Sequence, residues 1–194
     1  MIVKLLYVTN SEIKVKELKS VLKKHVDVTS VDSLFDLEYN VDFDVCSKSL
    51  EENAKKKAHL IWKKEKDNYD YIIADEYGLF SNYAPNILGI ESDTWWPGTQ
   101  RERNEALVNL FDGVKDREIY YHSVFVAIGK DGKVNMSEGH TYGYLGKKVK
   151  ERNGEGYDSV FITEDGKYLS HHEPEDILKY SARIEALTKL AQLL

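Results

Sequence analysis

The sequence predicts an α/β fold built around a long mixed β-sheet that is flanked by helices. Residues 2–9 alternate in a β-rich run that leads into a helical repeat, and residues 50–66 carry apolar side chains on one helical face. Residues 119–145 contain two strand-like stretches on either side of a tight turn. Strands and helices in this order are typical of α/β proteins. At 194 residues, of which 42% are hydrophobic, the chain is long enough for one domain, which we expect to span residues 1–194.

The first strand is expected to lead through a tight loop into a helix. Ser11 is a suitable N-cap, and Val15, Leu18 and Leu22 follow at helical spacing. A second helix is expected over residues 50–66, with lysines on the face opposite its apolar side chains. Both helices therefore have one face suited to the core and one suited to water.

The middle of the chain contains a short apolar run, Tyr71–Ala74, followed by the acidic pair Asp75 and Glu76. This pattern predicts a buried strand that delivers two carboxylates at its end, which is a common position for an active site. Residues 101–111 are expected to be helical. The sequence Lys130–Gly132 between two strand-like stretches predicts a hairpin.

The last third of the chain carries weaker signals. A second hairpin is expected at Asp165 and Gly166, and an amphipathic helix over residues 181–194. The adjacent histidines His171 and His172 stand in a polar stretch without a spaced third histidine or a cysteine, so we expect surface residues there and no zinc site.

Composition excludes several classes of protein. A net charge of −6 gives no basic field to hold a nucleic-acid polymer. The single cysteine, Cys46, cannot form an internal disulfide, which favours the cytoplasm. The apolar start of the chain is too short for a signal peptide and no other stretch is long enough to span a membrane, so no membrane partner is expected.

The first candidate for chemistry is the turn Thr9, Asn10 and Ser11 together with Lys14. A polar turn at a helix N-terminus favours phosphate oxygens, and Lys14 adds a full positive charge. The same residues also suit a capped helix with a solvated lysine, which is the commoner arrangement. In the second helix Lys57 belongs to a lysine-rich face that, taken alone, indicates a solvated surface.

The second candidate is a set of carboxylates. Asp75 and Glu76 are costly to bury unless a cation or a set of donors compensates them, and hard oxygen ligands suit Mg²⁺ or Mn²⁺. Asp42 and Asp44 lie two residues apart, so in an extended segment both would point the same way. Alternatively, Gly78 fits a turn with exposed acids, and the upstream pair simply keeps a loop soluble.

A third candidate lies near the end of the chain. Gly156, Tyr157 and Asp158 offer close backbone approach, a ring for stacking and an acceptor for a base or sugar. Arg183, with Lys179 just before it, suits a base carbonyl or a phosphate, although a surface carboxylate is its commoner partner.

Taken in order, these segments resemble the inosine triphosphate pyrophosphatase family, also called the non-standard purine NTP pyrophosphatases, over nearly the whole chain. That family has a T-G-N-x-x-K turn, then E-N-A-x-x-K-A, A-D-D-S-G-L, P-G-x-x-S, G-F-G-Y-D and S-H-R-x-x-A. The corresponding segments are Thr9–Lys14, Glu52–Ala58, Ala74–Leu79, Gly89–Ser92, Glu155–Asp158 and Ser181–Ala186, and Glu52–Ala58 is a full match.

The resemblance implies an elongated mixed sheet of two lobes with a nucleotide cleft between them, in a homodimer. It implies hydrolysis of a nucleoside triphosphate to the monophosphate and pyrophosphate with Mg²⁺ or Mn²⁺. The implied metal ligands are Asp44, Asp75 and Glu76, and the implied catalytic residues are Glu76, Asp75 and Lys14. The implied substrate-binding residues are Thr9, Asn10, Ser11, Lys57, Tyr77, Gly156, Tyr157, Asp158, Lys179 and Arg183.

The chain also departs from the family pattern. Ser11 stands in place of Asn, Glu76 of Asp, Tyr77 of Ser, Thr94 of Arg, Glu155 of Phe and Ala182 of His. The residues expected to hold phosphate and metal are thus largely retained, whereas those expected to read the base are altered.

Two alternatives remain open at this point. One is a pyrophosphatase for another modified nucleotide, and the other is a nucleotide-binding or sequestering protein with weak turnover. Asp44, Asp75 and Glu76 favour catalysis, because a protein that only binds anions has no use for carboxylates where the phosphates lie.

Overall fold

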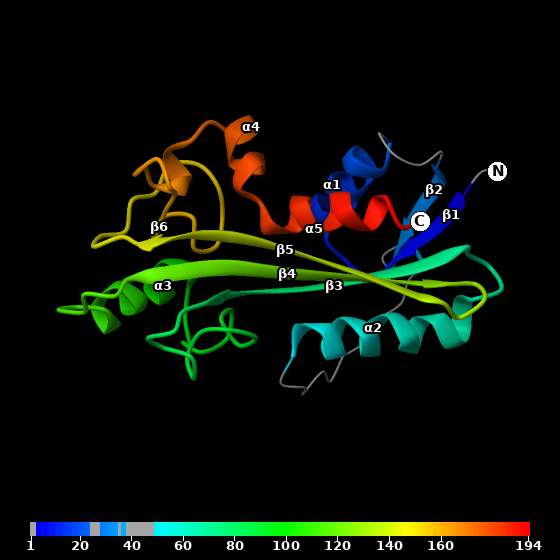
Figure 1. Cartoon of the computed structure of the whole chain (residues 1–194), viewed down its shortest axis with the longest axis horizontal. Helices are drawn as coiled ribbons and strands as arrows, with labels where there is room; N and C mark the ends of the chain where they lie inside the picture. Colours follow the sequence, from blue (N-terminus) through cyan, green and yellow to red (C-terminus); the bar gives the residue numbers. More distant parts are fainter. Residues whose placement is uncertain (1–2, 24–27, 35, 38–48) are drawn as a thin grey trace. The chain divides into compact units, whose positions relative to one another are not determined.

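The computed structural model describes residues 3–23, 28–34, 36–37 and 49–194. Its strands form one sheet in the order β2-β1-β3-β4-β5-β6 (Figure 1). The strands are β1 (Val3–Tyr7), β2 (Val28–Ser33), β3 (Tyr71–Phe80), β4 (Glu118–Gly129), β5 (Val134–Leu145) and β6 (Phe161–Ile162). The α-helices are α1 (Glu12–Leu22), α2 (Leu50–Glu65), α3 (Gln100–Leu110), α4 (Pro174–Ile177) and α5 (Ala182–Ala191), with 3₁₀ turns at Leu169–His171 and Leu178–Tyr180.

The sheet is mixed, as the sequence predicts. β1 pairs in parallel with β2 and with β3, and Tyr7 lies opposite Ser33 on one side and Ile73 on the other. At the far edge β5 and β6 pair antiparallel through Leu145 and Phe161. The predicted α/β fold with a mixed sheet and flanking helices is therefore confirmed.

The chain divides into two compact units. Unit 1 comprises residues 1–77, 123–139 and 183–194, and unit 2 comprises residues 78–122 and 140–182. β3, β4 and β5 each contribute residues to both units. The expectation that the whole chain is a single domain stays a prediction.

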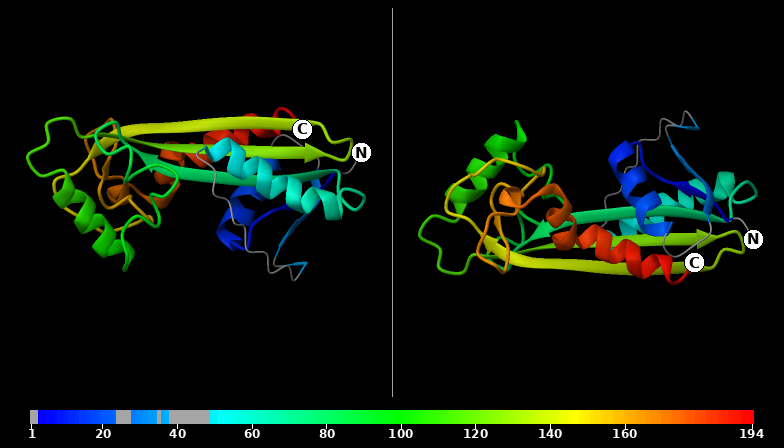
Figure 2. Two further views of the ribbon diagram at one scale, coloured as in Figure 1. Left: turned by 90° about the horizontal axis from the view of Figure 1, so that it is seen from below. Right: turned by 90° about the horizontal axis from the view of Figure 1, so that it is seen from above.

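In unit 1 the strands lie between helices, with α1 and α5 on one face and α2 on the other (Figure 1). Leu18 of α1 and Leu187 of α5 meet Leu5 and Ile73 of the strands in a buried cluster. The view from above shows α5 lying along the strands (Figure 2). The apolar spacing of both helices thus fixes which of their faces meets the sheet.

Unit 2 has its own core. Phe111, at the end of α3, packs with Ile119 of β4, Tyr157, Val160 and Phe161. A capping box, in which Thr99 and Glu102 satisfy each other's backbone amides, begins α3. These apolar residues lie far apart in the sequence, so this core depends on the tertiary fold.

Most predicted elements appear close to their expected bounds. The helix expected over residues 50–66 is α2, Leu50–Glu65, and the predicted hairpin joins β4 to β5. In that hairpin the Gly129 N–H donates to the Lys133 carbonyl at 2.8 Å, and Gly132 has a φ of 84°, which favours glycine. The second predicted turn has Gly166 at a φ of 81°.

Two expectations were wrong. β3 does not end at the acidic pair but continues to Phe80, so Asp75 and Glu76 lie inside the strand. The second concerns His172, which is buried, with its Nε2 3.0 Å from Thr163 Oγ1. The polar residues around His172 do not reveal this burial, because its partner Thr163 lies nine positions earlier in the chain.

Within the described residues, no helix combines the length and apolar character needed to cross a membrane. β2, which the sequence analysis did not predict, is an edge strand with a polar sequence, VTSVDS. Its residues give neither a clear alternation nor an apolar run.

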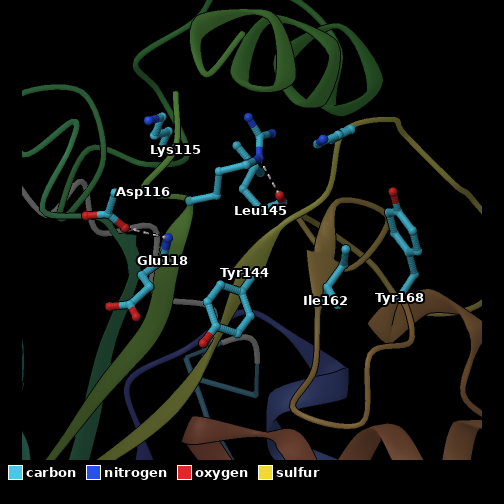
Figure 3. A pocket seen from close by; sticks show the side chains of 9 residues that line it. Lys115, Asp116, Glu118, Tyr144, Leu145, Ile162 and Tyr168 are labelled. Atoms are coloured by element: carbon cyan, nitrogen blue, oxygen red, sulfur yellow. Dashed lines mark hydrogen bonds between the residues drawn. The ribbon is translucent and has the colours of Figure 1, made fainter. Parts of the chain in front are cut away.

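Arg117 ties three segments of unit 2 together. Its guanidinium donates to the carbonyl of Leu145 at 2.8 Å, to that of Gly146 at 2.8 Å and to that of Phe111. Planar guanidinium is suited to this because its donors point in fixed, separate directions. Arg117 also borders a pocket of about 610 Å³ (Figure 3). The other lining residues are Lys115, Asp116, Glu118, Tyr144, Leu145, Lys147, Ile162 and Tyr168.

Replacing Arg117 by lysine should therefore destabilise the protein although the charge is kept. An ammonium group cannot reach three carbonyls in these directions, so we expect the free energy of unfolding to fall by about 2 kcal/mol. Urea denaturation followed by tryptophan fluorescence measures this. Arg101→Lys is the matched control, because the ion pairs of Arg101 with Glu105 and Glu151 are exposed, and its change should stay within about 0.5 kcal/mol. Equal losses for both variants would contradict the role given to Arg117.

Candidate active site

The loop between β1 and α1 is closed by short side chains. Thr9 Oγ1 accepts a hydrogen bond from the Ser11 N–H at 3.1 Å, and Ser11 Oγ accepts one from the Lys14 N–H at 3.4 Å. Ser11 is thus the N-cap of α1, as the sequence predicts. Asn10 is exposed beside it. This end of a helix favours an anion, because amide N–H groups and the positive end of the helix dipole meet there.

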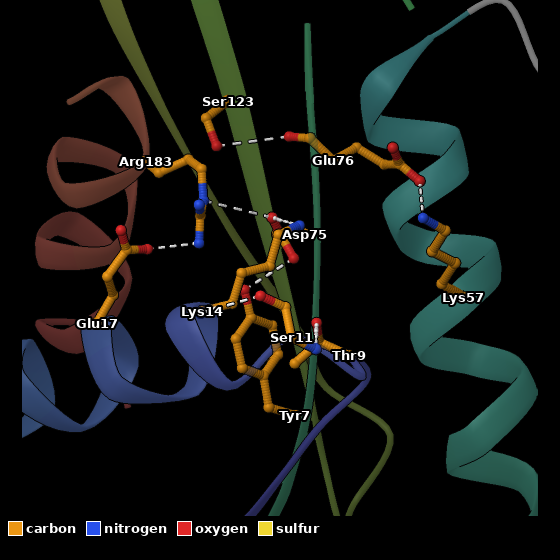
Figure 4. Close-up of polar contacts among 10 residues, drawn as sticks. All are labelled: Tyr7, Thr9, Ser11, Lys14, Glu17, Lys57, Asp75, Glu76, Ser123 and Arg183. Carbon is orange, nitrogen blue, oxygen red and sulfur yellow. Dashed lines mark hydrogen bonds and ion pairs between the residues drawn. The ribbon is translucent and has the colours of Figure 1, made fainter. Parts of the chain in front are cut away.

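Asp75 is the centre of a buried polar network in unit 1 (Figure 4). Its side chain is only 2% exposed. Tyr7 donates its hydroxyl to Asp75 Oδ1 at 2.7 Å, and Lys14 Nζ lies 2.8 Å from Oδ2. Arg183 Nε lies 3.8 Å from the same oxygen. A carboxylate buried among apolar strands is therefore compensated by a hydroxyl and two cations.

The same network shifts the pKa values of its members. Burial by itself raises the pKa of Asp75, but the charges of Lys14 and Arg183 and the hydrogen bonds to the carboxylate outweigh it, so the pKa lies below its usual value. Burial, and then the charge of Asp75, holds the pKa of Tyr7 well above its usual value. Asp75 is accordingly ionised and Tyr7 is a neutral donor at physiological pH.

Arg183, at the start of α5, has partners on two elements. Besides Asp75 of β3, it pairs with Glu17 of α1 at 2.5 Å. Burial alone lowers the pKa of Arg183, whereas the surrounding negative groups, Asp75 foremost, raise it to a net value above the usual one. These ion pairs fix the start of α5 against α1 and β3.

Tyr77 lies next to the cations of this network. The Nζ of Lys14 is 5.3 Å from the centroid of its ring, and the guanidinium carbon of Arg183 is 5.9 Å from it. Both distances are within the range in which a cation is attracted to the face of an aromatic ring. Tyr77 therefore helps to hold two cations where the sequence analysis expected substrate to bind.

Glu76 has different surroundings from Asp75. Adjacent residues of a strand point to opposite faces, so Asp75 faces α1 and α5 while Glu76 faces α2 (Figure 4). There Glu76 Oε1 forms an ion pair with Lys57. The Ser123 hydroxyl of β4 contacts the backbone carbonyl of Glu76 at 3.5 Å. The structure thus does not bring the two carboxylates together on one face of β3.

The loop Gly156–Asp158, which was predicted to bind the base, lies in unit 2 and is hydrogen-bonded to α3. Asn104, which is buried, donates to the Gly156 carbonyl at 2.9 Å and to Ser159 Oγ at 2.8 Å. Tyr157 is 2% exposed, and its hydroxyl accepts from the Trp95 indole at 2.9 Å. The ring of Tyr157 is thus part of the core of unit 2, and its role in base binding stays a prediction.

Asp158 accepts hydrogen bonds from within the loop and from β4. Its Oδ2 accepts from the Glu155 N–H at 3.0 Å, and its Oδ1 accepts from the Tyr121 hydroxyl at 3.3 Å. Burial raises the pKa of Asp158 to about 6, and these hydrogen bonds only partly offset it. The loop and α3 together line a pocket of about 320 Å³, near the lower limit for small-molecule sites.

The remaining predicted residues are placed as follows. Lys179 is exposed on unit 2 and pairs with Asp176 at 2.5 Å. The predicted metal ligand Asp44 and its neighbour Asp42 lie outside the described residues. Unit 1 contains the predicted residues Thr9, Asn10, Ser11, Lys14, Lys57, Asp75, Glu76, Tyr77 and Arg183, and unit 2 contains Gly156, Tyr157, Asp158 and Lys179.

The sequence analysis missed residues that support the predicted site residues through hydrogen bonds. Tyr7 was taken only as part of a β-rich strand, and Asn104 was not singled out. Such residues can be found in a sequence where a polar side chain occupies a position that the periodic pattern assigns to the core. Asn104 shows this pattern on α3, and the hydroxyl of Tyr7 shows it on β1.

Tyr7→Phe should test the buried hydrogen bond to Asp75. The ring is kept but Asp75 Oδ1 loses its donor, so we expect the free energy of unfolding to fall by about 1–3 kcal/mol in urea denaturation. The control is Tyr83→Phe, which removes a hydroxyl from a ring that is 48% exposed and should cost less than about 0.5 kcal/mol. If Tyr7→Phe unfolds at the same urea concentration as the wild type, the hydroxyl does not stabilise Asp75.

Asp158 should give the protein a pH-dependent stability. Its pKa is raised from 3.8 to about 6 by folding, so its contribution is fully present below about pH 4 and is lost as the pH rises past about 6. Relative to Asp158→Asn, the wild type should lose on the order of 2–3 kcal/mol of unfolding free energy between about pH 4 and pH 7. Urea denaturation at several pH values measures this, with Asp112→Asn as the control for loss of an exposed charge. A constant difference between wild type and Asp158→Asn would show that burial does not shift this carboxyl.

Comparison with known proteins finds relatives that match nearly the full length of this chain. The dITP/XTP pyrophosphatase of Thermoanaerobacter sp. (strain X514) is 30% identical over 192 residues, which cover 96% of this chain and 94% of the relative. That of Clostridium perfringens (strain 13 / Type A) is 31% identical over 195 residues, covering 96% and 95%. These relatives confirm the resemblance to the non-standard purine NTP pyrophosphatases.

Solved structures agree on the fold. The Staphylococcus aureus Ham1 protein superposes with a TM-score of 0.87 at 22% identity, covering 97% of this chain and 96% of that one. A HAM1 protein from Coxiella burnetii gives a TM-score of 0.86 at 19% identity, covering 100% and 98%. Residues 5–193 match the Ham1 family, and with relatives of 30% identity along nearly the full length this shows that the chain belongs to that family.

Proposed function

We propose that this chain hydrolyses a non-standard purine nucleoside triphosphate between its α- and β-phosphates, giving the monophosphate and pyrophosphate. The observation that supports this best is that unit 1 holds paired cations and carboxylates on both faces of β3. Lys14 and Arg183 meet on Asp75, and Lys57 meets Glu76. The relatives named dITP/XTP pyrophosphatases support the same reaction.

The three cations suit a triphosphate. Lys14 stands in the first turn of α1, where the helix N-terminus already favours phosphate oxygens. Arg183 and Lys57 are held by carboxylates and are partly buried, so they reach a phosphate without first being ordered. A bound triphosphate would take a share of these cations from their carboxylate partners, which supplies electrostatic stabilisation of the charge that develops on the phosphates.

A divalent cation fits Glu76. Among the described residues no donor forms a hydrogen bond with its buried Oε1 oxygen, which meets Lys57 in an ion pair. Mg²⁺, and equally Mn²⁺, prefers one or two carboxylates together with substrate phosphates. Asp75, already surrounded by donors, fits less directly, and Asp44 would complete the predicted set. When bound, the metal neutralises charge on the phosphate oxygens.

Glu76 is the residue to which we assign the role of proton acceptor for the attacking water. Its carboxylate lies beside Lys57 on the face of β3 opposite Asp75, and the backbone at this point is fixed within the strand. Asp75 in turn holds Lys14 through its 2.8 Å contact. Glu76 would thus orient and deprotonate the water, while Lys14 and Lys57 hold the phosphates against in-line attack.

The base and sugar are assigned to the loop of unit 2. Gly156 and the exposed Glu155 line its pocket, and Asp158 supplies an acceptor. We also propose the homodimer that the resemblance implies, and the cytoplasm as the compartment, since nucleotide pools are found there and the lone Cys46 needs no oxidising environment.

The decisive experiment is product identification over a panel of nucleoside triphosphates with Mg²⁺. Pyrophosphate and the monophosphate should appear together, and chelation with EDTA should stop the reaction. Orthophosphate as the first product would contradict cleavage between the α- and β-phosphates. Tight nucleotide binding without turnover would instead establish a sequestering protein.

Glu76→Gln should lower kcat by about 10²–10⁴-fold, because the change removes charge and basicity but keeps the shape. Nucleotide affinity should stay within about tenfold of the wild type. Glu105→Gln, which removes an exposed carboxylate on α3, is the control and should leave kcat unchanged. Wild-type turnover in Glu76→Gln would remove Glu76 from the mechanism.

Base discrimination should be weaker than the family pattern implies. Ala182 and Glu155 stand where the family has His and Phe, so one donor and one ring are missing, and a site that lacks a donor rejects the wrong base less strongly. We expect the preference in kcat/KM for ITP and XTP over ATP and GTP to be narrow or shifted, and Ala182→His to widen it. If the wild type prefers ITP by several orders of magnitude and Ala182→His changes nothing, other residues read the base.

A further inference from the structure

Unit 2 displays a row of aromatic and imidazole rings on one face of its strands. Tyr120 and His122 of β4, like His140 and Tyr142 of β5, stand two residues apart on their strands, so each pair points to one face; Tyr142 is exposed and the other three are half-buried. Phe80 of β3 extends the row, with its ring stacked on Tyr120 at 5.3 Å. Tyr142 is 69% exposed, which shows that solvent reaches this face.

The two histidines of this row form a close pair. The ring centroids of His122 and His140 are 4.2 Å apart, with the ring planes 16° from parallel. One ring nitrogen of each lies within 4.8 Å of the other. They come from strands that are neighbours in the sheet, so the backbone and not a flexible loop sets their spacing.

Aromatic neighbours hold both imidazoles. Phe80 lies 5.9 Å from His122, and Tyr142 is stacked on His140 at 5.9 Å with the planes 10° apart. Tyr120 lies 6.3 Å from His140. Flanking rings restrict the rotamers of the two histidines, so less side-chain freedom is lost when both rings are directed at one ion.

We propose that His122 and His140 bind a divalent transition-metal ion, with Zn²⁺ as its best representative. Neutral imidazole is a ligand for Zn²⁺, Ni²⁺ and Cu²⁺, whereas Mg²⁺ prefers the oxygen ligands found at Glu76. Two nitrogens on one tetrahedral zinc ion stand roughly 3.3 Å apart, so the pair needs only small side-chain rotations to close on it.

This site is separate from the proposed reaction. Its ligands are nitrogens of unit 2, and none of the residues assigned to phosphate or metal binding in unit 1 belongs to it. Zn²⁺ bound there should therefore leave Mg²⁺-dependent pyrophosphate release unchanged. A loss of zinc binding and a loss of turnover can then be told apart.

The test is Zn²⁺ titration of the full chain by calorimetry, repeated with Co²⁺ to follow the ligand-field absorbance. The wild type should bind one ion at this pair, and His122→Ala and His140→Ala should each lower its affinity by at least about tenfold, as loss of a direct ligand does at metal sites. His171→Ala, which removes another histidine of unit 2, is the control and should bind as the wild type does.

A second measurement keeps the result independent of folding. In the wild type, substoichiometric Zn²⁺ should shift the imidazole NMR signals of His122 and His140 while those of the other four histidines stay in place. Unchanged signals at the pair, or zinc binding that survives His122→Ala and His140→Ala, would overturn the proposal. Zinc binding that is lost only in Glu76→Gln would overturn it as well, because the ion would then occupy the carboxylates.

Discussion

The burial of one carboxylate, that of Asp75, decides how unit 1 is assembled. An ionised group inside a sheet is strongly destabilising unless donors and opposite charges surround it. Those partners come from three different elements, with Tyr7 on β1, Lys14 on α1 and Arg183 on α5. The start of the chain and its last helix must therefore meet at the middle of β3, and the same convergence creates the cluster of cations at the N-terminus of α1.

β3 divides the polar residues of unit 1 between its two faces. On one side Asp75 is saturated with donors, and its role is to fix cations. On the other side, among the residues that the structure describes, Glu76 Oε1 has Lys57 as an ion-pair partner and accepts no hydrogen bond. Alternation along an extended strand thus gives the two carboxylates different partners, although the two residues are adjacent in the sequence. A change of one methylene at position 76 therefore alters the reach of that carboxylate without touching the partners of Asp75.

Local patterns explain which parts of the fold were predictable. The cap at Ser11, the helix Leu50–Glu65 and the turn at Gly132 each depend on residues within a few positions, and all three match the expectation. The length of β3 was not predictable, because Asp75 and Glu76 interrupt its apolar run and the groups that compensate them lie far away in the sequence. A charged residue in mid-strand becomes intelligible only once its partners are placed.

For the site, the motifs located the cations and carboxylates of unit 1, whereas the surroundings of the base loop could not be foreseen. The ring of Tyr157 lies in the core, since its hydroxyl meets Trp95 and the backbone of Ser92. A glycine-rich loop with a tyrosine indicates a possible ligand contact, but burial of that tyrosine depends on Phe111 and Phe161, which no motif includes. Asn104 supports the loop from a helix some fifty positions earlier.

The distribution of indole rings gives each unit its own spectroscopic signature. Trp62 is the one tryptophan of unit 1, and its indole donates to the Gly129 carbonyl at 2.9 Å. Trp95 and Trp96 both belong to unit 2, and Trp95 is tied to the hydroxyl of Tyr157. With phenylalanine at position 62, the emission spectrum follows unit 2 alone, and with phenylalanine at 95 and 96 it follows unit 1 alone. Comparing the thermal unfolding curves of these two variants, followed by tryptophan fluorescence, therefore shows whether the two units unfold together in one cooperative transition, without an added label.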